Sequence, residues 1–409
     1  MKQSLLMFAV VLLSAGSAWS QQQPKRFLIG FKPRVAAAQR DETLSRLGAQ
    51  PVESFDDLDL VVADVPESAG ARVQMMSDDE LAGLQIVHIE EDVVTNWLLG
   101  AEPSFQASPM PSWAQVRASI PTFQKAAAPL NALPVGVEAS EVPWGVRRVN
   151  AAAAWAVTEG QGVRVAVIDT GIDASHPDLA GRVAGGYNAV DAGRPWFDDN
   201  VHGTHVSGTI AGNRDGRGVV GVAPKATLFA VKVLNNVGSG SISSIIKGLV
   251  WCAKNDIQVA NMSLGSPVGS VFLRLAIKYV SAKGVTIVAA AGNSGGSVSY
   301  PAAYPEAIAV SASDSQDQLA FFSSRGSRVD FVAPGVDVYS TEPGGHYGTH
   351  SGTSMATPHV AGLAALAVAA RGARGSEAVK AALARAAHPI GLRATEQGRG
   401  MIDAAELVR

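Results

Sequence analysis

Short apolar runs alternate with stretches of helical periodicity through the larger, C-terminal part of the chain. Strands are predicted at 163–168, 227–233, 257–262 and 285–290, and helices at 203–212, 242–255 and 271–282. A longer apolar run at 360–370, with Pro358 near its start, predicts a buried helix that begins around Thr353. Strands that alternate with helices form parallel sheets with right-handed crossovers. We therefore predict an α/β fold, a doubly wound parallel sheet with helices on both faces.

A different pattern precedes this part. Strand-like runs at 27–31, 58–62 and 86–92 and a polar helical stretch at 37–47 predict a small α+β domain over residues 21–97. From 98 to 141 the periodicity stops, and the composition is typical of a linker or an extended arm. Prolines stand among alanines there, at Pro103, Pro109, Pro111, Pro121, Pro129 and Pro134. The main domain is then expected to span residues 142–409.

The first 20 residues have the pattern of a leader. Met1-Lys2 is followed by an apolar run at 5–13 and then by Ala18-Trp19-Ser20, which matches a secretory signal with a small-residue cleavage site. The apolar run is too short to span a bilayer. We therefore expect export to the periplasm or out of the cell, without a membrane anchor.

The composition and charge of the chain restrict the kinds of partner that we expect. The chain has 33 basic and 36 acidic residues, a net charge of −3, which gives no reason to expect nucleic acid or an anionic membrane as a partner. Only 17% of residues are charged and 42 are glycine, which suits a compact fold with many tight turns. Because Cys252 is the only cysteine, no internal disulfide is possible, and stability outside the cell must come from packing or bound ions.

A serine stands at the start of the predicted buried helix. Ser354 lies in the small-residue stretch Gly352-Thr-Ser-Met-Ala-Thr-Pro-His-Val-Ala-Gly362. The positive end of a helix favours negative charge, so backbone N–H groups beside Ser354 would stabilise an oxyanion on a substrate carbonyl. On this stretch alone, a helix cap and a nucleophile explain Ser354 equally well.

Two motifs upstream favour the nucleophile. The predicted strand at 163–168 ends in Asp169-Thr-Gly-Ile-Asp173, and open α/β sheets place their chemistry at the carboxyl ends of strands. A second motif, His202-Gly-Thr-His-Val-Ser-Gly-Thr209, opens a small-residue helix. An Asp, His and Ser set supplies an acceptor for one ring nitrogen of the histidine and a client for the other. The order Asp, His, Ser is one of three unrelated orders that build this set.

With these motifs, residues 142–409 resemble the subtilisin-like serine proteases. Val142-Pro-Trp-Gly145 resembles the start of the mature enzyme, Asn261-Met-Ser-Leu-Gly265 a substrate-binding strand, and Ala289-Ala-Ala-Gly-Asn293 the oxyanion-hole segment. The resemblance implies a secreted serine endopeptidase that cleaves peptides and proteins through an acyl-enzyme, and we expect it to be a monomer.

The resemblance also implies a role for each catalytic residue. Asp169 would orient the base, and His202 would be the general base and then the general acid. Ser354 would be the nucleophile, and the side-chain amide of Asn293 would donate to the oxyanion.

The resemblance implies that a peptide substrate binds as an added strand between two chain segments, and that two pockets select its side chains. The segments are Gly238, Ser239, Gly240 and Ser263, Leu264, Gly265; the primary pocket is Ala290, Ala291, Gly292 and Ser299; the outer, apolar pocket is Ile242, Ile245 and Leu264. With no acid identified in the primary pocket, we expect apolar or aromatic side chains before the cut bond.

A structural calcium ion is a further implication. Asp178 and Asp215 fall where the family's tight calcium site has its ligands, although Ser140 replaces a Gln ligand that is common there. An oxygen-rich shell would suit this hard cation, and a plain solvated loop is the alternative. The implied ligands are Asp178, Asp215 and the main-chain oxygens of Asn213, Arg217 and Val219.

Residues 26–97 resemble the small βαββαβ inhibitor pro-domain of subtilisins, whose ending is similar to residues 89–92. The resemblance implies a self-processed precursor, with the chain's own pro-domain as an intramolecular inhibitor; an unrelated adaptor domain is the alternative. The Pro- and Ala-rich segment departs from the family, in which the pro-domain usually runs directly into the mature enzyme. The maturation cut therefore stays open between a position after Trp97, one before Val142, and both.

Three other functions compete with this prediction. Asp-Thr-Gly also marks aspartic proteases, but these need two carboxylates in one site, and the chain has no second Asp-Thr-Gly or Asp-Ser-Gly. His202 and His205 lack the His-Glu-x-x-His spacing of a zinc site, so we expect His205 to be a packed core histidine. A catalytically dead peptide-binding module that keeps the fold is the third hypothesis, and hydrolysis of casein would exclude it.

Overall fold

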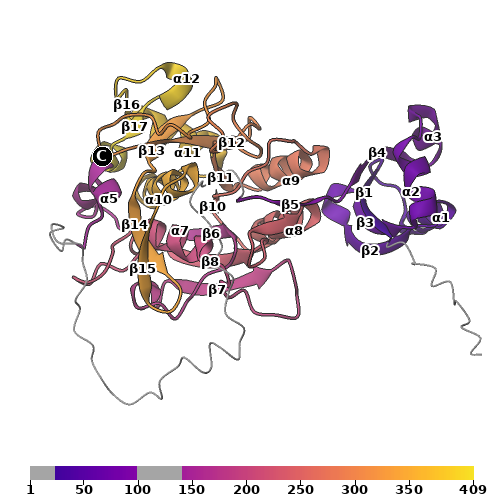
Figure 1. Cartoon of the computed structure of the whole chain (residues 1–409), viewed down its shortest axis with the longest axis horizontal. Coiled ribbons are helices and arrows are strands. Elements are labelled where there is room, and N and C mark those ends of the chain that lie inside the picture. The colour runs from indigo at the N-terminus through magenta and orange to yellow at the C-terminus, as the bar shows by residue number, and fades with distance from the viewer. Residues whose placement is uncertain (1–23, 99–140) are drawn as a thin grey trace, which may run out of the picture. The chain divides into compact units, whose positions relative to one another are not determined.

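The computed structural model describes residues 24–98 and 141–409, so the predicted leader and nearly all of the predicted linker lie outside the described residues (Figure 1). The chain divides into two compact units, Met1–Glu91 and Asp92–Arg409. The sequence placed the end of the first domain at Trp97, whereas residues 92–98 belong to the second unit. The reason is that residues 94–96 pair as a strand with residues 239–241 of the second unit.

The first unit is a four-stranded antiparallel sheet in the order β2-β3-β1-β4 with helices packed on it. Alternate residues of β1, Phe27, Ile29 and Phe31, lie on one face and form the core with buried residues such as Val61 and Leu44. The βαββαβ order that the resemblance implied is present, with the second helix divided in two. Its elements are β1 (Lys25–Phe31), α1 (Ala37–Arg46), β2 (Gln50–Phe55), η1 (Asp56–Leu58), β3 (Leu60–Val65), α2 (Glu67–Gln74), α3 (Asp78–Gly83) and β4 (Ile86–Glu91).

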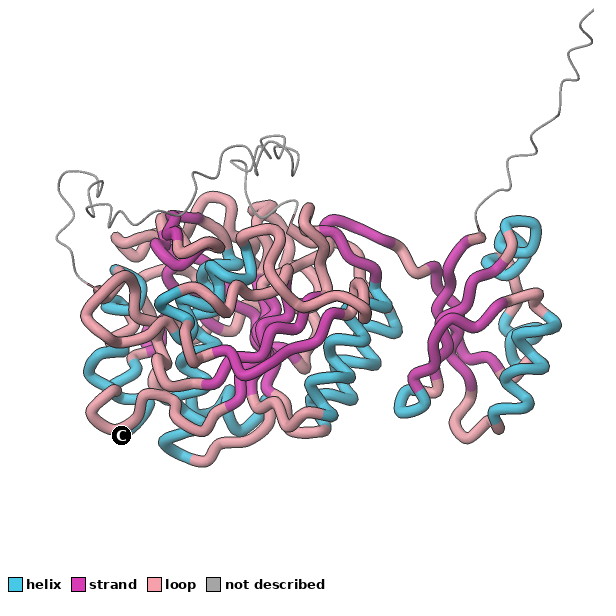
Figure 2. The backbone as a smooth tube through the Cα atoms, turned by 90° about the horizontal axis from the view of Figure 1, so that it is seen from below, coloured by secondary structure: helices cyan, strands magenta, loops and turns pink. Residues whose placement is uncertain are grey.

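The second unit is built on a seven-stranded parallel sheet in the order β13-β12-β11-β10-β6-β8-β7. Its strands run through the middle of the unit with helices outside them (Figure 2). The strands are β6 (Arg164–Asp169), β7 (Val183–Asn188), β8 (Thr227–Lys232), β10 (Val259–Met262), β11 (Thr286–Ala290), β12 (Ala307–Ser313) and β13 (Phe331–Pro334). The fold class predicted from the sequence is confirmed.

Helices cover both faces of this sheet. α8 (Ile242–Lys254) packs beside α9 (Val271–Ala282), and α7 (His202–Ala211) packs beside α10 (Thr353–Arg371) (Figure 1). α10 is long and apolar enough to cross a membrane, but it is buried as a core helix, with its small residues against the sheet. The other helices among the described residues of this unit are α5 (Trp144–Arg148), α6 (Ala151–Ala154), η2 (Pro177–Leu179), α11 (Ser376–Arg385), α12 (Ala394–Gln397) and α13 (Ala404–Val408).

Short two-stranded pairings complete the unit. They join β5 (Val94–Asn96) with β9 (Ser239–Ser241), β14 (Val338–Glu342) with β15 (His346–His350), and β16 (Ala387–His388) with β17 (Met401–Ile402). The sequence patterns did not predict β7, β12, β13 or these pairs. β7 is a glycine-containing edge strand, and the paired strands are too short or too polar to leave a hydrophobic pattern.

The strand order fixes where a site can form. After β6 the chain builds β7 and β8 on one side of it, and from β10 onward it builds on the other side. In open parallel sheets such a reversal leaves a crevice outside the carboxyl ends of the two neighbouring strands. β6 ends at Asp169, and β10 leads directly into Ser263, so both segments open onto this crevice.

Candidate active site

Asp169 and His202 form a hydrogen-bonded pair at the end of β6. His202 Nδ1 lies 2.8 Å from Oδ1 and 2.9 Å from Oδ2 of the Asp169 carboxylate, which is fully buried. The backbone N–H of Thr170 donates to the same Oδ1 at 2.7 Å. A carboxylate at this position fixes the tautomer with hydrogen on Nδ1, so that Nε2 is the basic nitrogen of His202.

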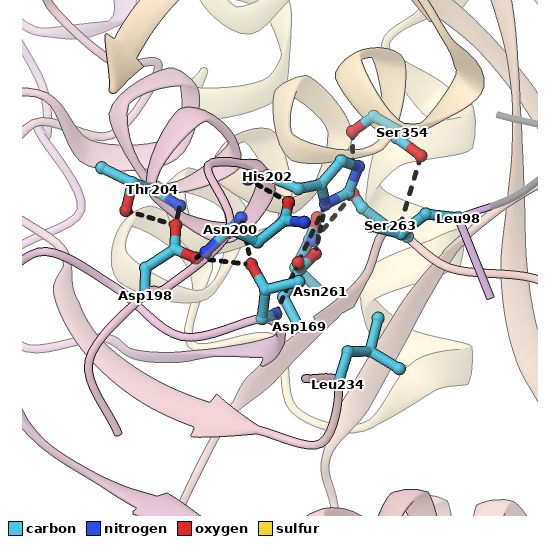
Figure 3. A network of polar contacts seen from close by, with 12 residues as sticks. Leu98, Asp169, Asp198, Asn200, His202, Thr204, Leu234, Asn261, Ser263 and Ser354 are labelled. Carbon is cyan, nitrogen blue, oxygen red and sulfur yellow. Dashed lines mark hydrogen bonds and ion pairs between the residues drawn. The ribbon is translucent and has the colours of Figure 1, made fainter. Parts of the chain in front are cut away.

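Ser354 is the second residue of α10 and lies beside this pair; Figure 3 shows the His202 ring between Asp169 and Ser354. Its Oγ donates to the main-chain oxygen of Ser263 at 3.2 Å. The Ser263 hydroxyl in turn donates to the main-chain oxygen of Ser354 at 2.8 Å, and it accepts from Asn261 Nδ2 at 3.0 Å. The end of β10 therefore holds the start of α10 in place.

The amide of Asn293 is oriented by the residue before Ser354. Asn293 Oδ1 accepts from both the backbone N–H and the hydroxyl of Thr353, each at 2.8 Å. The Thr353 hydroxyl also accepts from the backbone N–H of Gly292 at 3.1 Å. Because Oδ1 is used as an acceptor, Nδ2 is the donor end of this amide, and Asn293 and Ser354 line the same cavity.

This cavity has a volume of about 150 Å³ and lies on the carboxyl side of the sheet. Its wall combines small, apolar and amide side chains. The lining residues are Trp97, Leu264, Gly265, Pro267, Ala290, Gly292, Asn293, Ser294, Ser299, Thr353 and Ser354.

A segment of the chain itself lies along the cleft. β5 pairs antiparallel with β9, with Thr95 opposite Gly240. Trp97 continues the pairing, because its N–H donates to the Gly238 oxygen at 3.0 Å and its oxygen accepts from Gly265 N–H at 3.1 Å. The segment is thus bound on both sides through its main chain. At its start, both carboxylate oxygens of Asp92 accept from Ser243, at 2.8 and 2.6 Å.

Comparison with known proteins places this chain in a family. The model of the subtilase family matches residues 160–405. The chain is 40% identical to M-protease of Shouchella clausii over 362 residues, which are 88% of this chain and 85% of that protein. It is 38% identical to subtilisin E of Bacillus subtilis over 378 residues, which are 88% of this chain and 86% of that protein. The chain belongs to the subtilase family.

This subtilase is also 54% identical to subtilisin Savinase of Lederbergia lenta, over 229 residues that cover 56% of this chain and 84% of that protein. It is therefore a serine endopeptidase with the subtilisin-like α/β fold. The named relatives carry the words protease and subtilisin, which agrees with the reaction class that the sequence predicted.

The structure brings five of the twelve implied substrate-binding residues of this subtilase to the cavity: Leu264, Gly265, Ala290, Gly292 and Ser299. Gly238, Ser239 and Gly240 instead pair with the chain segment at 94–97. Ala291 is fully buried and does not line the cavity, and its main chain bonds to Val310 and Ser299. Ile242 and Ile245 lie at the start of α8, where Ile245 is fully buried, and neither lines the cavity. Sequence reasoning missed the walls contributed by Trp97, Pro267 and Ser294, which have no motif of their own.

The loop implied to bind calcium lies against η2. Asn213 N–H donates to the main-chain oxygen of Asp178 at 2.7 Å, and Val219 N–H donates to Asp178 Oδ2 at 2.7 Å. Burial raises the pKa of the Asp178 carboxyl, and the charge of Asp215 adds to the rise. Arg217 Nη2 lies 3.2 Å from Asp215 Oδ2. Within the described residues there is no group of three or more His, Cys, Asp or Glu side chains that could hold a metal, so such a site would depend on main-chain oxygens.

The second histidine of the His202 motif, His205, is packed in the core. His205 is fully buried, and its Nε2 lies 3.1 Å from the Val338 oxygen and 3.3 Å from the Gly348 oxygen. Burial holds the pKa of His205 well below its ordinary value. The ring is packed and hydrogen-bonded in the core, so the geometry gives no support to a zinc site with His202.

Proposed function

We propose that this subtilase is made as an inactive precursor of a secreted endopeptidase and that Asp169, His202 and Ser354 cut peptide bonds through an acyl-enzyme. The observation that carries the proposal is the pair formed by His202 Nδ1 and both oxygens of Asp169, at 2.8 and 2.9 Å. This pair leaves Nε2 as the base beside a serine at a helix start.

The first chemical step moves one proton and forms one bond. The Ser354 hydroxyl turns from the Ser263 oxygen toward His202 Nε2, gives its proton to that nitrogen and attacks the substrate carbonyl carbon. The buried Asp169 carboxylate stabilises the imidazolium that results. Negative charge moves to the carbonyl oxygen, where Asn293 Nδ2 and the backbone N–H of Ser354 are the donors, since the N–H groups of Thr353 and Met355 are bonded to Asn293 and Gly352.

The second half of the cycle reverses these roles. The imidazolium of His202 gives its proton to the leaving amine, and the Ser354 ester remains. Water then attacks the ester with His202 as base again, which releases the new carboxylate. Both steps use the same oxyanion donors, so Asn293 contributes to acylation and deacylation alike.

Self-processing is supported by the chain segment in the cleft. Residues 92–98 are held as an extended strand by β9 and by Gly265, which is how we propose a peptide substrate binds. The Leu98 side chain lies close to Gly238, where an added Cβ would meet it at 2.7 Å. A bound strand of the chain's own blocks the same cleft to other peptides, so the precursor is inhibited. We propose that the first cut falls directly after this strand, at or next to Leu98.

A second cut before Val142 needs a different route. Glu141 Oε1 accepts from the N–H groups of Asp215 and Gly216 at 2.7 and 2.9 Å, and its main-chain oxygen accepts from Val220 N–H at 2.9 Å. These bonds hold the chain at Glu141 outside the cleft. The first cut should therefore have a rate that is independent of protein concentration, and a cut before Val142 should speed up as concentration rises. Mass mapping of precursor incubated at two concentrations distinguishes the two orders.

We propose a structural calcium ion on the η2 side of the loop at 213–219. The donor set fits a hard cation, because it consists of oxygens, and no hydrogen bond within the described residues engages the main-chain oxygens of Asn213, Arg217 and Val219. These oxygens and the carboxylates of Asp178 and Asp215 would hold the ion. The ion would supply stability and neutralise charge there, and no catalytic step depends on it.

The experiment that tests the proposal compares Ser354→Ala with Ser351→Ala. Ser351 is a matched control, because it lies three residues away and its hydroxyl bonds only to Asp337 among the described residues. Ser354→Ala should neither hydrolyse casein nor cut its own precursor, whereas Ser351→Ala should do both. Casein hydrolysis by purified Ser354→Ala would overturn the assignment of the nucleophile. A fully inactive parent enzyme would favour the peptide-binding module, and the mature N-terminus found by mass spectrometry would test export.

A further inference from the structure

A buried carboxylate lies between the two segments that carry the acid and the base of the proposed triad. Asp198 is 1% exposed. Its Oδ1 accepts from Thr170 Oγ1 at 2.8 Å and from Asn200 N–H at 3.0 Å. Its Oδ2 accepts from Thr204 N–H at 2.9 Å and from Thr204 Oγ1 at 2.6 Å, as the network in Figure 3 shows. Four donors on three residues thus converge on one side chain.

Each of these partners adjoins Asp169 or His202. Thr170 follows Asp169 and donates its N–H to the Asp169 carboxylate at 2.7 Å. Asn200 accepts from the backbone N–H of His202 at 3.2 Å through its Oδ1. Thr204 is in the first turn of α7, the helix that begins at His202. Asp198 itself touches neither member of the pair, so any effect it has on them passes through these neighbours.

The strand exit and the helix start fit closely. Gly203 N–H donates to Thr170 Oγ1 at 3.0 Å, and a Cβ added to Gly203 would collide with the main-chain oxygen of Gly171. The Thr170 hydroxyl therefore donates to Asp198 and accepts from the helix at the same time. The two backbones are thus in contact where the hydrogen bonds to Asp198 join them.

The carboxylate also completes the start of α7. The N-cap residue Val201 has no side chain that can cap the helix, and the first turn holds no acidic residue. A negative group at a helix start is stabilised by the N–H groups there. Burial raises the pKa of Asp198, while the hydrogen bonds from Thr204, Asn200 and Thr170 act against this rise. The site thus has the donors that a buried carboxylate requires.

We propose that Asp198 is a positioning residue that holds Thr170 to Thr204 and so keeps Asp169 and His202 at hydrogen-bonding distance. The proposal rests on the roles proposed above for Asp169 and His202. It concerns the geometry of the pair and assigns Asp198 no contact with substrate.

The test uses Asp198→Asn, which keeps the size and replaces one acceptor oxygen with a donor. The side-chain NH₂ group of the asparagine would face a backbone N–H donor at either Asn200 or Thr204, so the hydrogen bonds on that side would be lost. Asp173→Asn is the matched control, because Asp173 is also 1% exposed but its carboxylate bonds to Ser175 and Gly344. Each precursor is cut by tagged parent enzyme, which is then removed, and kcat, KM, Tm and the low-field proton signal of His202 Nδ1–H are measured.

Asp198→Asn should lower kcat by roughly 10- to 100-fold with KM unchanged within about twofold, since a misplaced catalytic group costs up to about that much. Its Nδ1–H signal should move upfield, whereas Asp173→Asn should lose Tm but keep kcat and the signal. A kcat within about twofold of the parent, or an equal kcat loss in Asp173→Asn, would overturn the proposal.

A second test, needed if Asp198→Asn does not fold, compares Thr170→Val with Thr170→Ser. Valine removes the hydroxyl that bonds to Asp198, and serine retains it. In Thr170→Val, kcat should fall by roughly 3- to 10-fold, as expected for one hydrogen bond of about 1 kcal/mol converted to a rate. In Thr170→Ser, kcat should stay close to that of the parent enzyme. Equal kcat in the two variants would refute the proposal. Casein hydrolysis by the parent and its loss in Ser354→Ala test the triad separately from these results.

Discussion

The structural and the chemical function of Asn293 can be measured separately. Its Oδ1 holds Thr353 by two hydrogen bonds of 2.8 Å, and its Nδ2 is the proposed donor to the oxyanion. Asn293→Asp keeps an acceptor for Thr353 but has no N–H group to donate. Asn293→Leu loses both functions, so the pair of variants distinguishes the cost of folding from the cost of catalysis.

The expected magnitudes follow from these bonds. One hydrogen bond to a charged group contributes about 1.5–3 kcal/mol, so losing the oxyanion donor should lower kcat by roughly 10- to 150-fold. Asn293→Asp should lose more than this, because its negative charge faces the developing oxyanion. Asn293→Leu should also lose roughly 1–3 kcal/mol of stability, from two hydrogen bonds at about 0.5–1.5 kcal/mol each.

The assay is kcat and KM on a chromogenic peptide, with Tm measured on the same samples. The donor acts mainly in the transition state, so the loss should be in kcat while KM stays nearly constant. If Asn293→Asp kept kcat within about threefold of the parent, or if the loss were confined to KM, Asn293 would not be an oxyanion donor. Its role would then be to hold the start of α10.

Three further results are expected. Excess chelator should lower Tm and leave activity in the cold unchanged, since a bound ion stabilises the folded state; an unchanged Tm would remove calcium at Asp178 and Asp215. Peroxide should lower kcat, because oxidation of Met355 to the sulfoxide would add a polar, bulkier group next to Ser354, in a site where Met355 is only 2% exposed; equally fast loss in Met355→Ala would assign the effect to another methionine. Burial lowers the pKa of His359 to about 4, so between pH 6.5 and 4 the unfolded chain binds more protons, and the free energy of unfolding should fall by up to about 3 kcal/mol as pH falls through this window. Urea titrations should show a smaller fall in His359→Gln.

Most of the large sheet could be predicted, because its strands are buried on both faces and carry continuous apolar runs. β6, β8, β10 and β11 begin and end within two residues of the predicted runs, as do α7, α8 and α9. β7 could not be predicted, because an edge strand with Gly185 and Gly186 has no apolar run to detect. Local pattern therefore predicts the interior of the sheet better than its edge.

The candidate catalytic residues were accessible from sequence because each stands in a compact motif. Their supports were not, since Thr353 holds Asn293 across 60 positions and Asp198 holds Thr170 across 28. Threonine and aspartate in such places are equally typical of helix caps and turns. Only the strand order, which brings the end of β6 against the start of α7, makes these side chains neighbours.

The segment at 92–98 shows why the domain boundary could not be drawn from pattern. Its strand β5 has three residues, and its partner β9 is the short stretch Ser239–Ser241, more than 140 positions away. Neither carries a hydrophobic period, because the pairing uses main-chain groups that every residue has. The sequence pattern groups residues 92–97 with the domain before them, whereas main-chain pairing groups residues 92–98 with the enzyme after them. A chain segment that belongs by sequence to one unit and by hydrogen bonds to the other is where a single cut would separate the two.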